Sequence, residues 1–380
     1  MIHPFRIDVP DKTLEQIRTQ VANYPWHEMP DDGGWAYGTH LGYMKELCAY
    51  WLNEFDWRKQ EAAINRFSHF IAPVQGIDLH FIREKGDGPS PLPLIISHGW
   101  PGSVVEFLDI IQPLAHPQRF GGSADDAFDV IVPSLPGFGF SGRPARPIGP
   151  RKIANLFNSL MTDVLGYRNY LAQGGDWGGA ISSWLGFEHA PTCQAIHINI
   201  LTMRHPDGPH GPEEEAWAVQ FEHDQLLENG YRTQQATKPQ TLSYAMMDSP
   251  VGVAAWIIEK FNSWSDTDGD NIESAHTKDS LLTNIMVYLV TRTFNTASWI
   301  YYGRREEGGR LLSTDNRRVE VPTAAALFPA ELLAWPPRSY VERLYNITHW
   351  SEMPRGGHFA ALEEPELLID DIRAFARTLR

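Results

Sequence analysis

A run of glycines around one aspartate, Gly174-Gly175-Asp176-Trp177-Gly178-Gly179, constrains the fold of this chain more than any other feature. It follows a short segment, 167–173, that is predicted to be a strand. Small residues on both sides of one larger residue are typical of a nucleophile elbow, G-x-S-x-G, where the chain turns sharply from a strand into a helix. Such a turn lifts the central side chain above the end of a parallel sheet, and here that side chain is Asp176 rather than serine.

A carboxylate changes the chemistry that this turn can carry. Serine attack on an ester or amide gives an acyl-enzyme, whereas a carboxylate is suited to attack an electrophilic sp³ carbon. The product of that attack is an alkyl ester of the protein itself. Asp176 therefore predicts epoxides or alkyl halides as substrates rather than esters.

Short apolar segments alternate with loops and helices through much of the chain. This alternation predicts an α/β protein, with a parallel sheet covered by helices. The predicted helices near the N-terminus are 13–23, with Thr13 and Gln16 as a capping box, 38–55 and 56–67. The predicted strands are 68–74, 78–83, 92–97, 128–132, 167–173, 195–200, 319–321 and 341–347, with Gln75-Gly76 as a turn.

The alternation stops between about residues 205 and 315, where the sequence favours helices, with amphipathic stretches over 216–225 and 251–261. An all-helical insertion between two halves of a sheet is predicted to form a lid over the strand ends, where ligands bind. The predicted organisation has an N-terminal helical extension with the first strands (1–90), the first half of the core (91–204), the helical lid (205–315) and the second half of the core (316–380).

Composition and short motifs argue against several classes of function. The formal charge is −15 and no Lys/Arg-rich run occurs, which argues against nucleic acid or an anionic membrane as a partner. Cys48 and Cys193 fit no metal or redox spacing, and without a metal-ligand or nucleotide-binding motif we expect no cofactor and no metal. We see neither a signal peptide nor a long apolar run, and so expect a cytoplasmic protein without a membrane anchor. The oligomeric state stays open, a homodimer included.

Asp176 needs a base, and His358 is the best of the fifteen histidines. It follows the last predicted strand on a glycine pair, and histidine comes last in the triad order of this type of turn. Glu331, just past the strand 319–321, is the predicted partner that orients His358, and Asp315 is the weaker alternative because it precedes that strand. Each position also has an interpretation without a catalytic role. His358 could be a histidine of a surface loop, and Glu331 could be a carboxylate at a helix N-terminus.

His98-Gly99-Trp100-Pro101 follows the strand 92–97, where the other half of an oxyanion hole is expected. The backbone N–H groups of Trp100 and Trp177 are predicted to converge on the carboxyl of Asp176. Their target is the oxyanion that forms when water attacks the ester.

Several motifs occur together: His98–Ser103, Gly174–Gly179, Asp248–Gly252 and 356–366. Together they resemble the microsomal-type epoxide hydrolases of the α/β-hydrolase superfamily, and Pro25-Trp26 with Phe55–Arg58 resembles that family's N-terminal domain. The resemblance covers nearly the whole chain. It implies an α/β-hydrolase fold, a mostly parallel central sheet flanked by helices, with a helical lid and an N-terminal meander extension.

The resemblance also implies roles for single residues. Asp176 corresponds to the nucleophile, His358 to the base and Glu331 to the acidic partner. Two lid tyrosines are implied as hydrogen-bond donors to the epoxide oxygen, and Tyr231 fits the first.

The second tyrosine falls within Ser298–Tyr302, where the spacing to Glu331 favours Tyr302 over Tyr301. Neighbouring residues on a helix or strand point in different directions, so Tyr301 and Tyr302 cannot both serve. The family's glutamate two residues past this tyrosine is absent, because Arg304 stands there.

The implied reaction converts a small-molecule epoxide and water to a vicinal diol through an ester of Asp176. Aromatic residues around the motifs, Trp100, Trp177, Phe138 and Phe140, favour a lipophilic or aryl epoxide. Detoxification, lipid metabolism and biosynthesis fit equally well. Two other functions stay open: a haloalkane dehalogenase with the same triad but without a need for paired tyrosines, and a non-catalytic hydrolase-fold protein that binds a hydrophobic ligand.

Overall fold

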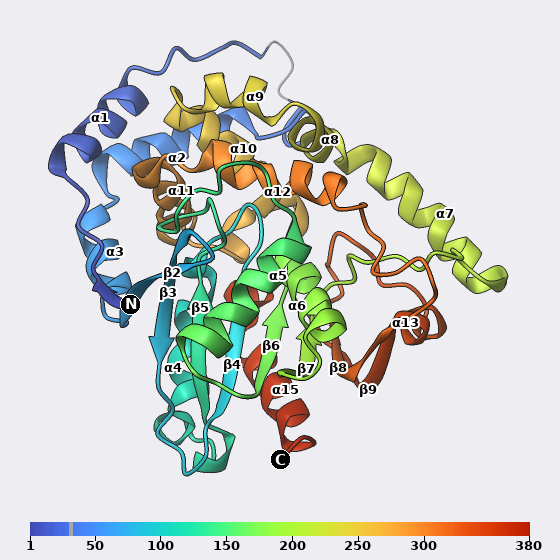
Figure 1. Ribbon diagram of the computed structural model, residues 1–380. Helices are drawn as coiled ribbons and strands as arrows, with labels where there is room; N and C mark the ends of the chain where they lie inside the picture. Colours follow the sequence, from blue (N-terminus) through green and yellow to red (C-terminus); the bar gives the residue numbers. More distant parts are fainter. Residues whose placement is uncertain (30–32) are drawn as a thin grey trace.

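The computed structural model describes residues 1–29 and 33–380 (Figure 1). Within these residues nine strands form one sheet with the order β1-β2-β3-β5-β4-β6-β7-β8-β9. The first three strands pair antiparallel, and all neighbours from β5 to β9 are parallel. The strands are β1 (His3–Phe5), β2 (His69–Val74), β3 (Ile77–Glu84), β4 (Leu92–Ser97), β5 (Phe128–Pro133), β6 (Tyr170–Gly174), β7 (Cys193–Ile198), β8 (Val319–Leu327) and β9 (Tyr345–Glu352).

Helices cover both faces of the sheet because the central strands are apolar on both sides. Along β4 the side chain of Ile95 belongs to one core cluster, and those of Leu94 and Ile96 belong to the other. Helices α5 and α6 contribute to the first cluster, and α4 and α15 to the second. The helices outside the lid region are α1 (Asp11–Ala22), α2 (Leu41–Asn53), α3 (Trp57–Ile64), α4 (Leu108–Ala115), α5 (Pro150–Ser159), α6 (Asp176–Glu188), α13 (Arg338–Leu344), α14 (Ala360–Glu363) and α15 (Pro365–Arg377).

Six further helices of the described residues follow in the lid region: most of them lie above the carboxyl ends of the strands, and α7 (Gly211–Glu228) extends to one side (Figure 1). The N-terminal helices reach this group as well: Thr39 donates a hydrogen bond to the carbonyl of Ala255, and Tyr50 donates one to Asp279. No helix in the described part of the chain is both long enough and apolar enough to cross a membrane. The six helices are α7 (Gly211–Glu228), α8 (Gly230–Thr237), α9 (Pro239–Met246), α10 (Pro250–Trp264), α11 (Lys278–Thr291) and α12 (Phe294–Glu306).

Most predicted elements occur close to their predicted positions. The strand 92–97 has the predicted bounds, and the turn at Gln75-Gly76 joins β2 to β3. The predicted capping box is wrong, because α1 begins at Asp11 after Pro10 and has no side-chain cap.

Two late elements also differ from the prediction. The strand predicted over 319–321 continues to Leu327 through three fully buried alanines, residues whose low strand propensity hid this part of β8. The strand predicted over 341–347 is wrong in its first half: Tyr340, Val341 and Leu344 bury one face of helix α13 at helical spacing, and β9 begins only at Tyr345.

Candidate active site

Asp176 stands at the sharp turn between β6 and α6. Its φ angle is +44°, a left-handed conformation that costs an L-residue roughly 1–2 kcal/mol. The turn is tight enough to require its glycines: a Cβ on Gly178 would lie 1.8 Å from the carbonyl oxygen of Ser97, and one on Gly99 would lie 2.1 Å from Asp176 Oδ1. The tight turn therefore places the Asp176 carboxylate in contact with the backbone of the loop after β4.

Two backbone donors hold this carboxylate. The N–H of Trp100 donates to Asp176 Oδ1 at 2.7 Å, and the N–H of Trp177 donates to the same carboxylate. Burial raises the pKa of Asp176, and His358 together with these two donors opposes that rise. The carboxylate thus lies where backbone dipoles stabilise negative charge.

His358 lies beside Asp176 with Glu331 on its other side. Its Nε2 is 3.7 Å from Asp176 Oδ2, and its Nδ1 is 2.9 Å from Glu331 Oε1. Burial lowers the pKa of His358, but the charge and hydrogen bond of Glu331, with the charge of Asp176, outweigh it and raise the pKa to about 9. The structure thus brings together the three predicted residues. Asp315, the alternative acid, is instead an exposed partner of Arg317.

Three contacts fix the histidine loop. The loop after β8 joins the loop after β9 through the N–H of Ala330, which donates to the carbonyl of Gly356. The N–H of His358 donates to the carbonyl of Trp264, whose ring meets the imidazole edge-on at 5.0 Å between centroids. Trp264 is not predictable from the sequence, because nothing in a helix-forming segment marks one tryptophan as a neighbour of the histidine.

The two lid tyrosines that face Asp176 are Tyr231 and Tyr301. Tyr231 stacks on Trp100 with 5.0 Å between ring centroids, and Tyr301 meets Trp177 edge-on at 4.7 Å. Both tyrosines line a cavity of about 350 Å³ that has Asp176 on its floor. Burial raises the pKa of both phenols, so each keeps its proton at neutral pH.

The prediction of Tyr302 is wrong, and Tyr301 occupies the place expected for it. Tyr301 shares the buried face of α12 with Ala297, one helical turn earlier, whereas Tyr302 points away and lies against the guanidinium of Arg305 at 4.3 Å. The sequence spacing to Glu331 could not distinguish Tyr301 from Tyr302. An irregular segment connects α12 to β8, so the number of residues between them does not fix which tyrosine faces Asp176.

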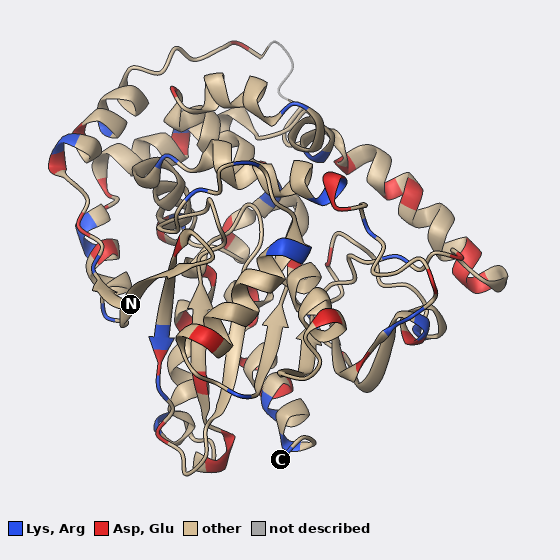
Figure 2. Cartoon of the chain, in the orientation of Figure 1, with Lys and Arg blue, Asp and Glu red and all other residues tan. Residues whose placement is uncertain are grey.

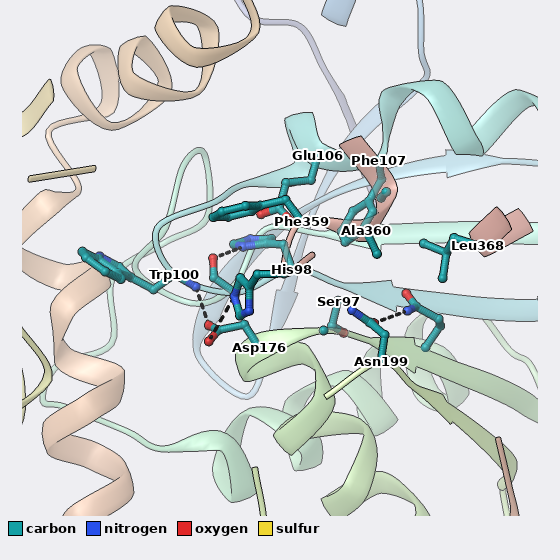
Figure 3. A pocket seen from close by; sticks show the side chains of 15 residues that line it. Ser97, His98, Trp100, Glu106, Phe107, Asp176, Asn199, Phe359, Ala360 and Leu368 are labelled. Carbon is teal, nitrogen blue, oxygen red and sulfur yellow. Dashed lines mark hydrogen bonds and ion pairs between the residues drawn. The ribbon is translucent and has the colours of Figure 1, made fainter. Parts of the chain in front are cut away.

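A second, smaller cavity lies behind Asp176, with Glu106 and Asn199 among the side chains around it (Figure 3). His358 also lines it. The cavity volume of about 20 Å³ is enough for one water molecule. Polar groups line it, among them Glu106, Gln173 and Asn199. Burial raises the pKa of Glu106 to about 8. The sequence analysis also missed Glu106, which stands in a short 3₁₀ turn, Val104–Phe107, after the His98–Ser103 motif.

Comparison with known proteins agrees with this geometry. Residues 2–107 match the family described as "Epoxide hydrolase N terminus", and residues 93–247 match the "alpha/beta hydrolase fold" family. Epoxide hydrolase 1 of Sus scrofa is 33% identical over 401 residues, which cover 98% of this chain and 88% of that protein. The chain belongs to the epoxide hydrolase family.

Two solved structures are similar over the whole length of this epoxide hydrolase family member. The Aspergillus niger epoxide hydrolase matches with a TM-score of 0.88 and 28% identity, covering 100% of this chain and 97% of that one. The juvenile hormone epoxide hydrolase of Bombyx mori matches with a TM-score of 0.89 and 28% identity, covering 100% and 96%. The predicted α/β-hydrolase fold is confirmed.

Proposed function

We propose that this epoxide hydrolase converts a lipophilic or aryl epoxide to a vicinal diol through an ester of Asp176. One observation carries the proposal: the Asp176 carboxylate lies on the floor of a covered cavity, 3.7 Å from His358 and facing the two phenols of the lid. The apolar and aromatic lining of that cavity includes Trp177, Leu332 and Leu333, which suits a hydrophobic ring substituent.

In the first step an oxygen of Asp176 attacks one carbon of the epoxide, and the bond from that carbon to the ring oxygen breaks. The ring oxygen takes a proton from Tyr231 or Tyr301 as its negative charge develops. General acid help of this kind contributes typically about 10² to 10⁴ in rate. The product is a hydroxyalkyl ester of Asp176.

The first step also prepares the base for the second. In the free protein the negative charge of Asp176 is one of the causes that raise the pKa of His358. Once Asp176 is an ester that charge is gone, so the pKa of His358 falls and the neutral imidazole becomes available. Glu331 still holds Nδ1, which leaves Nε2 facing the ester.

In the second step a water molecule loses a proton to His358 and attacks the carbonyl carbon of the ester. We place this water in the small cavity behind Asp176, where Glu106 can accept or donate a hydrogen bond to it. The N–H groups of Trp100 and Trp177 stabilise the oxyanion. The bond between the carbonyl carbon and the alkoxy oxygen then breaks as protonated His358 gives its proton to that oxygen, and the diol leaves. The remaining proton on the Asp176 carboxyl group returns to the tyrosinate left by the first step, so the site is restored and Asp176 retains one oxygen from water.

Two alternatives predict different products. A haloalkane dehalogenase would release halide and would not need proton donors, and the two phenols over Asp176 favour the epoxide. A non-catalytic protein usually lacks a triad member, and none is missing among Asp176, His358 and Glu331. Styrene oxide and a bromoalkane, supplied separately, test the proposal by diol and bromide release. Bromide release without diol formation would contradict it.

The cytoplasmic location remains a prediction, and the oligomeric state, a homodimer included, stays open. Cell fractionation tests the first, and light scattering on the purified protein tests the second.

A further inference from the structure

Four arginines are among the residues that line the larger cavity. Arg232 of α8, Arg304 and Arg305 of α12 and Arg310 of the loop after α12 line the cavity that has Asp176 on its floor. The chain as a whole carries a formal charge of −15, so four cations around one cavity run against its overall balance. Composition alone could not reveal this local excess of positive charge.

Two of the four arginines have local roles. Arg305 is exposed and pairs with Glu306. Arg304 donates hydrogen bonds to the carbonyls of Thr202 and Gly309, and its guanidinium stacks on Trp177 at 5.1 Å. These contacts explain Arg304 as part of the cavity wall.

Arg232 and Arg310 lack an acidic partner, although the guanidinium of Arg310 lies over the ring of Phe221 at 5.6 Å. Within residues 1–29 and 33–380, neither side chain makes a hydrogen bond or an ion pair, although both are half-buried. Burial lowers the pKa of Arg310 well below its usual value, and the neighbouring charges of Arg304, Arg204 and Arg232 add to the effect. Two guanidinium groups are thus held close together and partly desolvated without a counter-charge, which is unfavourable until an anion binds.

The acidic residues that line the cavity already have partners. Glu228 accepts from Lys260 and from the indole N–H of Trp264, each at 3.1 Å. Asp176 is held by His358 and the two backbone donors. Neither carboxylate pairs with Arg232 or Arg310, which leaves both guanidinium groups open to an anionic ligand.

We propose that the epoxide taken by this site carries a carboxylate, which binds Arg232 and Arg310 while the ring lies between Asp176 and the two tyrosines. This inference rests on the proposed function and narrows its substrate class to epoxy acids. Guanidinium groups pair with carboxylates through two parallel hydrogen bonds, which fixes the orientation of the substrate as well as its affinity. A cavity of about 350 Å³ lies near the lower end of the range for small-molecule sites, so the acid is compact.

A matched pair of substrates tests the proposal. 4-(Oxiran-2-yl)benzoate and 4-(oxiran-2-yl)benzamide have nearly the same shape and differ in charge. We expect the wild type to prefer the benzoate in kcat/KM by about tenfold or more at low ionic strength, mainly through KM. In the double variant Arg232→Gln, Arg310→Gln that preference is lost. Arg338→Gln, which removes an exposed arginine paired with Glu342, is the control and keeps the wild-type ratio.

The outcomes separate this inference from the proposed function. Equal kcat/KM for benzoate and benzamide in the wild type would overturn the inference and leave the epoxide hydrolase activity standing. If neither substrate is converted, the proposed function fails, and calorimetry with the two corresponding diols still decides the inference. Tighter binding of the diol benzoate that is lost in the double variant would support it, and equal binding of the two diols would overturn it.

Discussion

The two cavities that meet at Asp176 differ in size, charge and surroundings. The cavity in front, about 350 Å³, is formed by lid helices and the ends of strands, and arginines and phenols line it. The cavity behind, about 20 Å³, lies within the core, and the polar side chains that line it include Glu106, Gln173 and Asn199. Figure 2 shows both kinds of charge spread over the ribbon, so the contrast belongs to the cavities and not to whole domains.

Because of this difference, the Asp176 carboxylate faces two unlike cavities. The larger cavity in front can admit an epoxide beside the phenols that would protonate it, and the smaller cavity behind can admit only a molecule the size of water. Asp176 lines both cavities, and His358 lines the one behind. In the proposed mechanism each reaction step uses one cavity.

Replacement of His358 should stop the second reaction step and leave the first one intact. His358→Gln removes the base of the second step but leaves Asp176 and the phenols in place. We expect kcat to fall by about 10⁴-fold or more, with one equivalent of epoxide held as an ester of Asp176. Mass analysis of the intact protein after mixing with styrene oxide checks this. Full turnover by this variant would show that the histidine is not the base.

Neighbouring tyrosines on α12 offer a matched test of the front cavity. Tyr301→Phe removes a phenol that faces Asp176, and we expect kcat/KM to fall by about 10²-fold. Tyr302→Phe alters only a partly exposed ring beside Arg305, and we expect a change within about twofold. Steady-state kinetics on both variants give the result, and the reverse order would restore Tyr302 as the donor.

Glu106→Gln should affect only the back cavity. The amide preserves the shape of the side chain but changes its hydrogen bonding to water, so ester hydrolysis should slow by roughly tenfold. Rapid-quench measurements distinguish this step from ester formation, which we expect to be unchanged. Slower ester formation with normal hydrolysis would place Glu106 on the substrate side instead.

The pKa of His358 should report the charge of Asp176. The pKa is about 9 in the free protein, above the ordinary value, and the negative charge of Asp176 helps to raise it. Asp176→Asn imitates the uncharged ester, so the pKa should fall. NMR titration of the imidazole checks the direction of this shift. An unchanged pKa would show that ester formation at Asp176 does not prepare His358 to act as the base.

The same raised pKa has a consequence for stability. His358 binds its proton more tightly in the folded protein than in the unfolded chain, where the ordinary value is about 6.5. Its contribution to stability is therefore complete below about pH 6.5 and is lost as the pH rises through about 9. Thermal unfolding of the wild type and of His358→Gln between these pH values should show the difference between them shrinking as the pH rises.

The sequence predicted the parts of the site that depend on local geometry. The turn at Asp176 needs glycines at fixed positions, and these are visible in the sequence. Likewise, His358 and Glu331 each follow a strand of a parallel sheet, so the fold brings them to the same edge.

The parts that the sequence did not predict depend on how helices sit in space. Tyr301 and Tyr302 are neighbours, and only the rotation of α12 against the core decides which one faces Asp176. Trp264 and the pair Arg232 and Arg310 come from different segments around the lid, and no short-range pattern links them. Glu106 reaches the back cavity because Gly102 leaves room: a Cβ there would lie 1.3 Å from Glu106 Oε1.

The central claim is that a carbon–oxygen bond forms at Asp176 and that water then attacks the carbonyl carbon of the resulting ester. One turnover in ¹⁸O-labelled water, followed by mass analysis of the diol and of the peptide that contains Asp176, tests both together. We predict that the label appears in the Asp176 carboxylate and that the first diol released carries none. Label in the diol with an unlabelled Asp176 would mean direct hydration of the epoxide, and would contradict the account.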